Sequence, residues 1–237
     1  MKKTAKIIST ITLGMLILIV SSSFVLFKKA KLSNEKISMC DSCGKDPETT
    51  LKTNMRKLWE DHVTWTRNVI LCLVDELPGA DQAVKRLMQN QTDIGNAVKT
   101  YYGEDAGNKL TELLKSHIAI SADVVKSAKA SNTAALDAAN KKWFANADEI
   151  ATFLCKANPK WNITEMKKMM DDHLKLTTDE AVQRIKKNYD ADIAAYDKVH
   201  EEILKMADML TEGIVKQFPE KFKKAKIKSE SKKVAEK

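Results

Sequence analysis

Four histidines stand at positions where a helix would bury them: His62, His117, His173 and His200. In residues 57–68, KLWEDHVTWTRN, the histidine follows a leucine by four positions and precedes a tryptophan by three. Helical residues three and four positions apart share a face, so this histidine belongs to an apolar face. Similar spacing surrounds the other three. Buried imidazoles coordinate transition metals, transfer protons or take part in hydrogen-bond networks.

We expect His62, Asp93, His117 and Asp148 to form one layer in the core of a helical bundle. Counting residues from each expected turn places Asp93 opposite His62, and places Asn146 and Asp148 opposite His117. Helical metal sites are built from imidazoles and carboxylates that converge in a bundle core. This mixture of ligands favours zinc, iron, manganese or copper over calcium or magnesium. The sequence therefore predicts a core transition-metal site, or a site for another small ligand.

His173 and His200 are further candidate metal ligands. Asp197 and His200 form a D-x-x-H pattern, a shortened relative of the E-x-x-H motif of di-iron bundles. Those proteins need two E-x-x-H helices and two further glutamates. The sequence contains neither, so we do not expect ferritin-like oxidation.

Two other interpretations stay open. In the first, buried polar residues only bond to one another and fix the register of the helices, with Arg67, Asn90 and Tyr196 as partners. The protein is then a non-catalytic interaction or scaffold protein of the cell envelope. In the second, a core histidine is the general base of an enzyme, which requires a deep polar pocket. The sequence has no glycine-rich phosphate loop and no G-x-S-x-G motif, which favours a protein without enzymatic activity.

The elements that would position these side chains are helices, because 237 residues contain only 7 Gly and 4 Pro. Asn162 with Glu165 forms a capping box, and Thr177 with Glu180 repeats that signature. We expect an all-α, antiparallel up-and-down bundle. Its expected parts are four long helices at about 48–77, 80–102, 105–129 and 133–156, a short inserted helix from residue 162, and a long C-terminal helix at about 178–217.

A weak internal repeat runs through these helices. The peptides HVTWTRNV, HIAISADV and HLKLTTDE begin at the first three histidines. Asn90 follows the first histidine by 28 positions, Asn146 follows the second by 29, and Asn188 follows the third after a shorter gap. The pattern indicates a duplicated helical hairpin, although short matches in helical sequence also arise by chance.

The N-terminal segment is suited to a membrane. Residues 7–27 carry no charge, and three lysines precede them. These 21 residues extend about 30 Å as a helix, the thickness of a bilayer core. The segment is either an uncleaved anchor or a cleaved secretory signal. We therefore expect a cell-membrane protein with an extracytoplasmic domain, or a secreted one. The expected parts are an anchor or signal at 1–30, a linker at 31–46, the bundle at 47–218 and a basic tail at 219–237.

The net charge of +8 is confined to the ends of the chain. Residues 1–39 hold 7 Lys and 1 Glu, and residues 219–237 hold 8 Lys and 3 Glu, so residues 40–218 carry −3. A nucleic-acid-binding domain would carry its basic charge on the folded body, so no nucleic-acid partner is expected. The lysine tail is either a solvated end or a contact to anionic lipid or an anionic wall polymer.

The four cysteines fall into two groups. Cys40 and Cys43 form a C-x-x-C in the linker, a candidate disulfide or redox pair whose role the sequence leaves open. Cys72 and Cys155 lie in expected helices that run in opposite directions. Their heights differ by roughly 25 Å if the histidine layer is level. A disulfide needs Cα atoms within about 7 Å, so we expect these two to be free and buried.

Several motifs recur together over residues 55–222: HVTWTR, NQTDIG, YYGEDAGNKLTELL, NADEIA, ANPKW, YDKVH and QFPEKF. With them, the chain resembles an uncharacterised family of small helical-bundle proteins from Gram-positive spore-forming bacteria. Some members are labelled glycosyltransferase or acetylglutamate kinase, but no sugar-nucleotide or ATP site is visible in this sequence. The resemblance implies that the family pattern includes His62, Trp65, Arg67, Asn90, Asp93, His117, Asn146, Asp148, His173 and His200.

Overall fold

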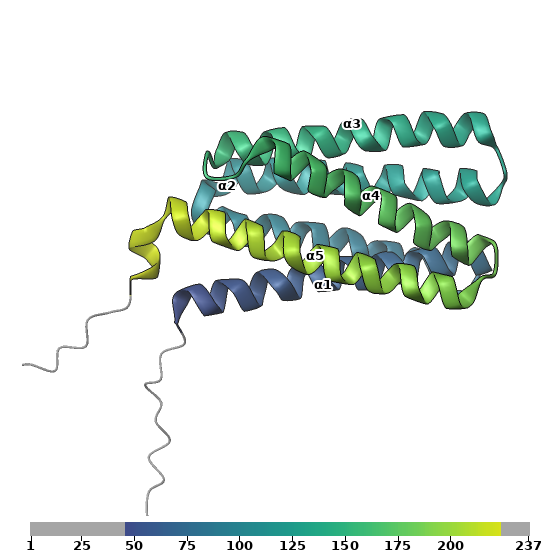
Figure 1. The fold of residues 1–237 in the computed structure, drawn as a ribbon, viewed down its shortest axis with the longest axis horizontal. Coiled ribbons are helices and arrows are strands. Elements are labelled where there is room, and N and C mark those ends of the chain that lie inside the picture. The colour runs from purple at the N-terminus through teal and green to yellow at the C-terminus, as the bar shows by residue number, and fades with distance from the viewer. Residues whose placement is uncertain (1–45, 224–237) are drawn as a thin grey trace, which may run out of the picture. The chain divides into compact units, whose positions relative to one another are not determined.

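The computed structural model describes residues 46–223, which form a bundle of helices without strands (Figure 1). The elements are α1 (Pro47–Asp75), α2 (Ala80–Lys129), α3 (Thr133–Ala157), α4 (Ile163–Ile185), α5 (Tyr189–Gln217) and the short 3-10 helix η1 (Pro219–Phe222). The all-α prediction is confirmed. Among these residues, no helix combines the length and apolar character needed to cross a membrane. The predicted span at 7–27, the C-x-x-C pair and most of the basic tail lie outside the described residues.

Helix α2 is two antiparallel arms, residues 80–102 and residues 104–129, joined at Gly103. Gly103 has φ 85° and ψ 173°, a conformation that is essentially restricted to glycine. The arms touch through their backbones, because a Cβ on Gly95 would lie 2.6 Å from the carbonyl oxygen of Gly107. The expected break between the second and third helices is therefore confirmed at Gly103.

The helices form three hairpins. Hairpin 1 is α1 with the first arm of α2, hairpin 2 is the second arm of α2 with α3, and hairpin 3 is α4 with α5. Helix α3 packs against α4, and α5 packs back against α1, which closes the ring (Figure 1). The first helix of each hairpin faces inward, and the three meet through Ile70, Val125 and Ala181.

The core repeats with a period of 55 or 56 residues. Ile70, Val125 and Ala181 occupy equivalent positions, eight residues after the histidine of each hairpin. Further buried sets have the same spacing: Met55, Leu110 and Met166; Trp59, Leu114 and Met170; and the histidines His62, His117 and His173. The structure supports the internal repeat expected from the sequence and extends it from two copies to three.

The predicted end of the bundle was wrong. Thr177 and Glu180 do not start a helix at 178; they are buried inside α4, which begins much earlier. Asn162 caps α4 as predicted, since its side chain accepts hydrogen bonds from two backbone N–H groups of the first turn. The chain reverses at Lys187, whose φ is 59°, so one expected long helix is two helices of a hairpin.

Each hairpin turns through a non-glycine residue in the left-handed conformation. Glu76, Ser131 and Lys187 have φ values of 55°, 52° and 59°. In each turn the backbone N–H of the residue that follows donates to the carbonyl oxygen five positions earlier in the chain, at 3.1, 3.0 and 3.0 Å. This bond is the mark of a Schellman C-cap, which usually contains glycine. The third turn, at residues 186–188, has neither glycine nor proline, and only one asparagine follows its two lysines, so no strong local signal marks it.

The two helical cysteines, Cys72 and Cys155, are free, as predicted. Both are half-buried, so the expectation of full burial was wrong. The expected opposite directions of their helices hold, because the chain reverses three times between α1 and α3, near Glu76, at Gly103 and near Ser131.

The left-handed turn yields a stability prediction. Replacing Lys187 with glycine should raise the free energy of unfolding by about 0.5–1 kcal/mol, because the Cβ strain of the left-handed conformation disappears. Lys186, with φ −74°, is the matched control. There, glycine should lower the free energy of unfolding, since it only adds disorder to the unfolded chain. Urea denaturation of both variants measures the difference, and equal effects at the two lysines would contradict the turn.

Candidate functional site

Three histidines, one from each hairpin, lie in the core. His62, His117 and His173 are 3%, 3% and 4% exposed. The ring centroids of His62 and His173 are 5.9 Å apart. The predicted burial of these three side chains on apolar helix faces is confirmed.

In hairpins 1 and 2 an asparagine of the second helix bonds the first helix in the same way. Asn90 Nδ2 donates to the carbonyl of Leu58 at 2.9 Å, and Asn146 Nδ2 donates to the carbonyl of Leu113 at 3.2 Å. Each leucine lies four residues before the histidine of its hairpin. The two asparagines therefore set the same register, which explains the 28- and 29-residue spacing seen in the sequence.

In hairpin 3 the corresponding partner is a carboxylate. His173 Nδ1 donates to Glu202 Oε2 at 2.9 Å, again 29 residues further along the chain. The sequence comparison had paired this histidine with Asn188, which instead lies at the start of α5. The predicted gap between His173 and its partner was too short, because the third copy has glutamate, not asparagine, 29 residues after the histidine.

His117 has partners on both ring nitrogens. Trp143 Nε1 donates to His117 Nε2 at 3.0 Å, so the proton of the neutral ring lies on Nδ1 and is donated to Asn146 Oδ1 at 2.8 Å. Burial lowers the pKa of His117 to about 3, with His173 nearby adding to the effect. A neutral ring with both nitrogens bonded has no lone pair left for a metal ion.

His62 is less completely paired. Burial lowers its pKa to about 3, helped by the nearby histidines, while the amides of Asn90 and Gln91 act in the opposite direction. Its Nδ1 atom makes no hydrogen bond with any described residue. Gln91 is fully buried and donates to Asn90 Oδ1 at 3.1 Å and to the carbonyl of Leu87 at 2.8 Å. Amide side chains, not carboxylates, therefore surround this histidine on the α2 side.

The two carboxylates predicted for the layer lie on the surface. Asp148 forms an ion pair with Lys167 at 3.1 Å and its side chain is 55% exposed, while the side chain of Asp93 is 38% exposed. Each stands two residues from a buried amide, Gln91 or Asn146, and two residues correspond to about 200° around a helix. Counting from the turns gave the height of these residues but not the face, so the four-residue layer is not formed.

The remaining predicted ligand, His200, is partly exposed and bonds Glu60 Oε1 through Nε2 at 3.0 Å. Asp197 of the D-x-x-H pattern is exposed. Within residues 46–223, no three His, Cys, Asp or Glu side chains are grouped so that they could hold a metal ion. Binding of zinc, iron, manganese or copper at these histidines stays a prediction that this arrangement does not support.

A buried ionic cluster joins hairpins 1 and 3. Arg67 donates to Glu180 at 2.8 Å and to Asp192 at 2.9 and 3.2 Å. Arg184 bonds both Asp192 and Asp75. Burial raises the pKa of Glu180 to about 7, against the opposing effect of Arg67. This cluster was not predicted from the sequence, because Glu180 was assigned to a helix cap.

The whole chain was compared with protein-family models, with curated protein sequences and with solved structures, and none of them matches. The resemblance to the spore-former family therefore stays a prediction. Function has to be argued from the geometry of the bundle.

The neutral state of His117 predicts how stability depends on pH. Its folded pKa of about 3 lies below the ordinary value of 6.5, so between these values the unfolded chain binds the extra proton. The free energy of unfolding should fall with decreasing pH, by about 1.4 kcal/mol per pH unit for this group. The free energy of unfolding is measured by urea denaturation at several pH values between pH 7 and pH 5. Its slope against pH should be smaller in His117→Gln, by up to this amount, than in the unmodified chain. Asn146→Ala, which removes the hydrogen bond but keeps the ring, should lose stability and keep the slope.

The metal prediction can be tested directly. The full chain, purified from medium supplemented with zinc, iron, manganese and copper, should contain less than one equivalent of each metal. His62→Ala should not change these amounts, because the neighbours of this histidine are amides and histidines already engaged in bonds. One metal ion per chain, lost in His62→Ala, would contradict this interpretation and favour the metal site.

Proposed function

We propose that this protein is a non-catalytic, membrane-tethered interaction protein of the cell envelope, in which the polar core is structural. The observation that carries the proposal is the position of the two ends of the bundle. The start of α1 and the helix η1 lie at the same end, and η1 packs against α1 and α5 (Figure 1). The three hairpin turns at Glu76, Ser131 and Lys187 belong to the opposite end.

The described residues therefore begin and end at the same end of the bundle, and in the sequence one basic segment precedes them and the other follows. Residues 1–39 carry +6 and residues 219–237 carry +5, whereas residues 40–218 carry −3. Near an anionic membrane each lysine contributes about 1 kcal/mol of attraction. In this proposal the segment at 7–27 anchors the chain and the tail adds a contact to anionic lipid.

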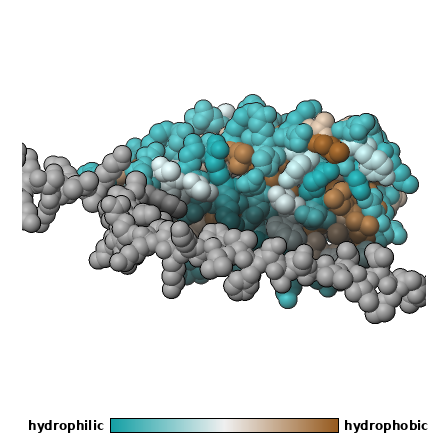
Figure 2. All heavy atoms as spheres, turned by 90° about the horizontal axis from the view of Figure 1, so that it is seen from below, coloured by the Kyte–Doolittle hydropathy of each residue, from teal (hydrophilic) through white to brown (hydrophobic). Residues whose placement is uncertain are grey.

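The surface of the bundle suits exposure to water. The face in Figure 2 is mainly hydrophilic, with a few hydrophobic residues toward the end opposite the termini. Among the described residues the large hydrophobic side chains that are exposed are Leu77, Ile163, Tyr189 and Ile193. Scattered apolar residues of this kind are ordinary on a soluble domain.

The core supports a structural role for its polar groups. His117 has two partners, His173 has Glu202, and Glu180 and Asp192 bond arginines, whereas His62 Nδ1 and Glu180 Oε2 have no partner among the described residues. Paired buried groups fix the register of helices, whereas a catalytic centre needs polar groups aimed at a space that admits substrate. The cell-envelope scaffold alternative is therefore favoured over a metal-handling protein or an enzyme.

The test uses the full chain with a fluorophore at its C-terminus, reconstituted into vesicles that contain an acceptor lipid. Energy transfer should be higher on phosphatidylserine vesicles than on phosphatidylcholine vesicles, and the difference should vanish in 0.5 M salt, roughly where screening is complete. The matched variant carries glutamine at Lys224, Lys226, Lys228, Lys232 and Lys233. It should show equal transfer on both vesicles.

Two results would contradict the proposal. Equal transfer by the unmodified chain on both lipids means that the tail does not contact the anionic surface. Release of the chain from vesicles in high salt means that residues 7–27 are not an anchor, because an inserted helix is insensitive to salt.

A further inference from the structure

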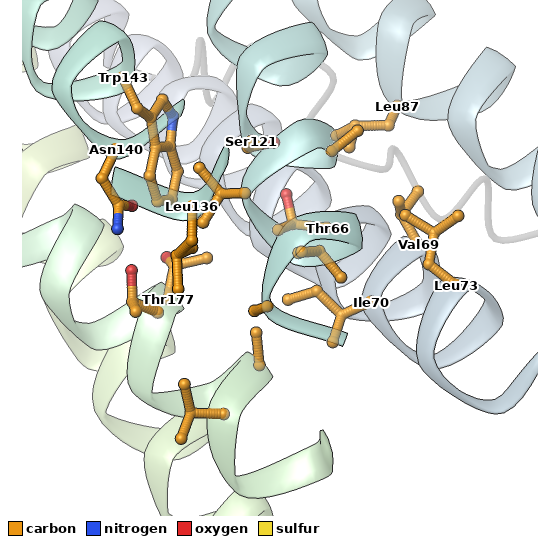
Figure 3. Close-up of a pocket in the computed structure, with 17 residues that line it drawn as sticks. Thr66, Val69, Ile70, Leu73, Leu87, Ser121, Leu136, Asn140, Trp143 and Thr177 are labelled. Carbon is orange, nitrogen blue, oxygen red and sulfur yellow. The ribbon is translucent and has the colours of Figure 1, made fainter. Parts of the chain in front are cut away.

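A cavity of about 60 Å³, partly open to solvent, is lined by residues of α1, both arms of α2, α3 and α4 (Figure 3). The repeat explains why it exists. Eight residues after its histidine, hairpin 1 has Ile70, hairpin 2 has Val125, and hairpin 3 has only Ala181. The smaller side chain of the third copy leaves the space that an isoleucine or valine would fill.

Three hydroxyl groups in the cavity wall are already satisfied by their own helices. Thr66 donates to the carbonyl of His62 at 2.8 Å, and Ser121 donates to that of Ile118 at 2.9 Å. Thr178 Oγ1 donates to the carbonyl of Leu174 at 2.8 Å. These groups therefore do not demand a partner inside the cavity.

Two other polar atoms in the cavity wall lack a hydrogen-bond partner within the part of the chain that the structure describes. Thr177 is 5% exposed, and its Oγ1 has no hydrogen-bond partner among residues 46–223. Asn140 Oδ1 is likewise buried and unpaired within the described chain. Figure 3 shows the polar ends of Asn140 and Thr177 turned toward each other beside Trp143. Thr177 is equivalent to Thr66 and Ser121, which both bond their own helix, so its unpaired state is peculiar to the third copy.

We propose that this cavity binds a short aliphatic alcohol, or another small molecule with one hydroxyl group and a short alkyl chain. The hydroxyl oxygen of the ligand accepts a hydrogen bond from Thr177, and the hydroxyl hydrogen is donated to Asn140 Oδ1. The alkyl chain lies against the apolar wall formed by Val124, Val125 and Ala181. This inference does not depend on the proposed function.

Size and polarity favour an amphipathic ligand over water. A water molecule occupies about 30 Å³ in the liquid, and a cavity of about 150 Å³ accepts benzene. By these ratios the space suits a molecule of roughly two or three non-hydrogen atoms. A single water can bridge the two oxygens, but a second water against the apolar wall would lack the two to four polar partners that buried water needs.

The probe is ethanol, added to the full chain and followed by methyl NMR. The methyl signals of Val124 and Val125 should shift and saturate, with a dissociation constant in about the millimolar range for so small a ligand. Thr177→Val keeps the shape but removes the hydroxyl, so it should weaken binding by about five-fold. Thr178→Val is the matched control, and it should leave the affinity unchanged because that hydroxyl bonds its own helix.

Xenon, which has no polar group, separates the cavity from its polar end. Xenon should shift the same methyl signals equally in the unmodified chain and in Thr177→Val. Ala181→Ile, which copies hairpin 1, should abolish the response to both probes. If Ala181→Ile does not fold, the smaller change Ala181→Val replaces it and should weaken both responses. The proposal is overturned if ethanol gives no saturable shift, or if it binds Thr177→Val as tightly as the unmodified chain.

Discussion

Burial of the three histidines constrains the whole bundle, because a polar atom of a buried ring is costly unless it finds a partner inside the protein. For His117 and His173 a partner comes from the second helix of the same hairpin, 29 residues later, and His117 also accepts from Trp143. A shift of α3 along α2 by one turn would separate His117 from Asn146 and Trp143. Each unpaired buried group costs about 1–3 kcal/mol. The apolar layers above and below the histidines then follow the register that these polar contacts set.

Closing the ring poses a different problem, because α1 and α5 are joined only through the other helices. Their interface combines apolar contacts with ion pairs. Arg67 bonds Glu180 and Asp192, and Arg56 bonds Asp208 Oδ1 at 2.7 Å. Buried ion pairs contribute little net stability, since desolvation offsets their attraction, but a misplaced one is costly. We therefore infer that these ion pairs hold hairpin 3 against hairpin 1 in one register. Apolar side chains alone specify that register less strictly.

The sequence revealed the parts of the fold that rest on strong local signals. Gly103 marked the reversal in α2, and the spacing around His62 marked its apolar face, since both depend on residues close together in the chain. The turn at Lys187 could not be seen, because its left-handed residue is a lysine held by tertiary packing. Asp93 and Asp148 were misplaced for a related reason. Height along a bundle follows from counting residues, whereas the face depends on the rotation of each helix, which only packing fixes.

The third copy of the repeat departs from the other two at chemically informative positions. Where hairpins 1 and 2 have asparagine opposite the histidine, hairpin 3 has Glu202; seven residues after the histidine, valine is replaced by Glu180; and one residue further the branched side chain becomes Ala181. The first two copies show that the fold itself is satisfied by amides and aliphatic residues. Folding alone therefore does not require a buried carboxylate at Glu180 or an enlarged space at Ala181. Glu180 belongs to the ion pairs with Arg67, and Ala181 lines the cavity, so these two features are confined to hairpin 3 and its contacts.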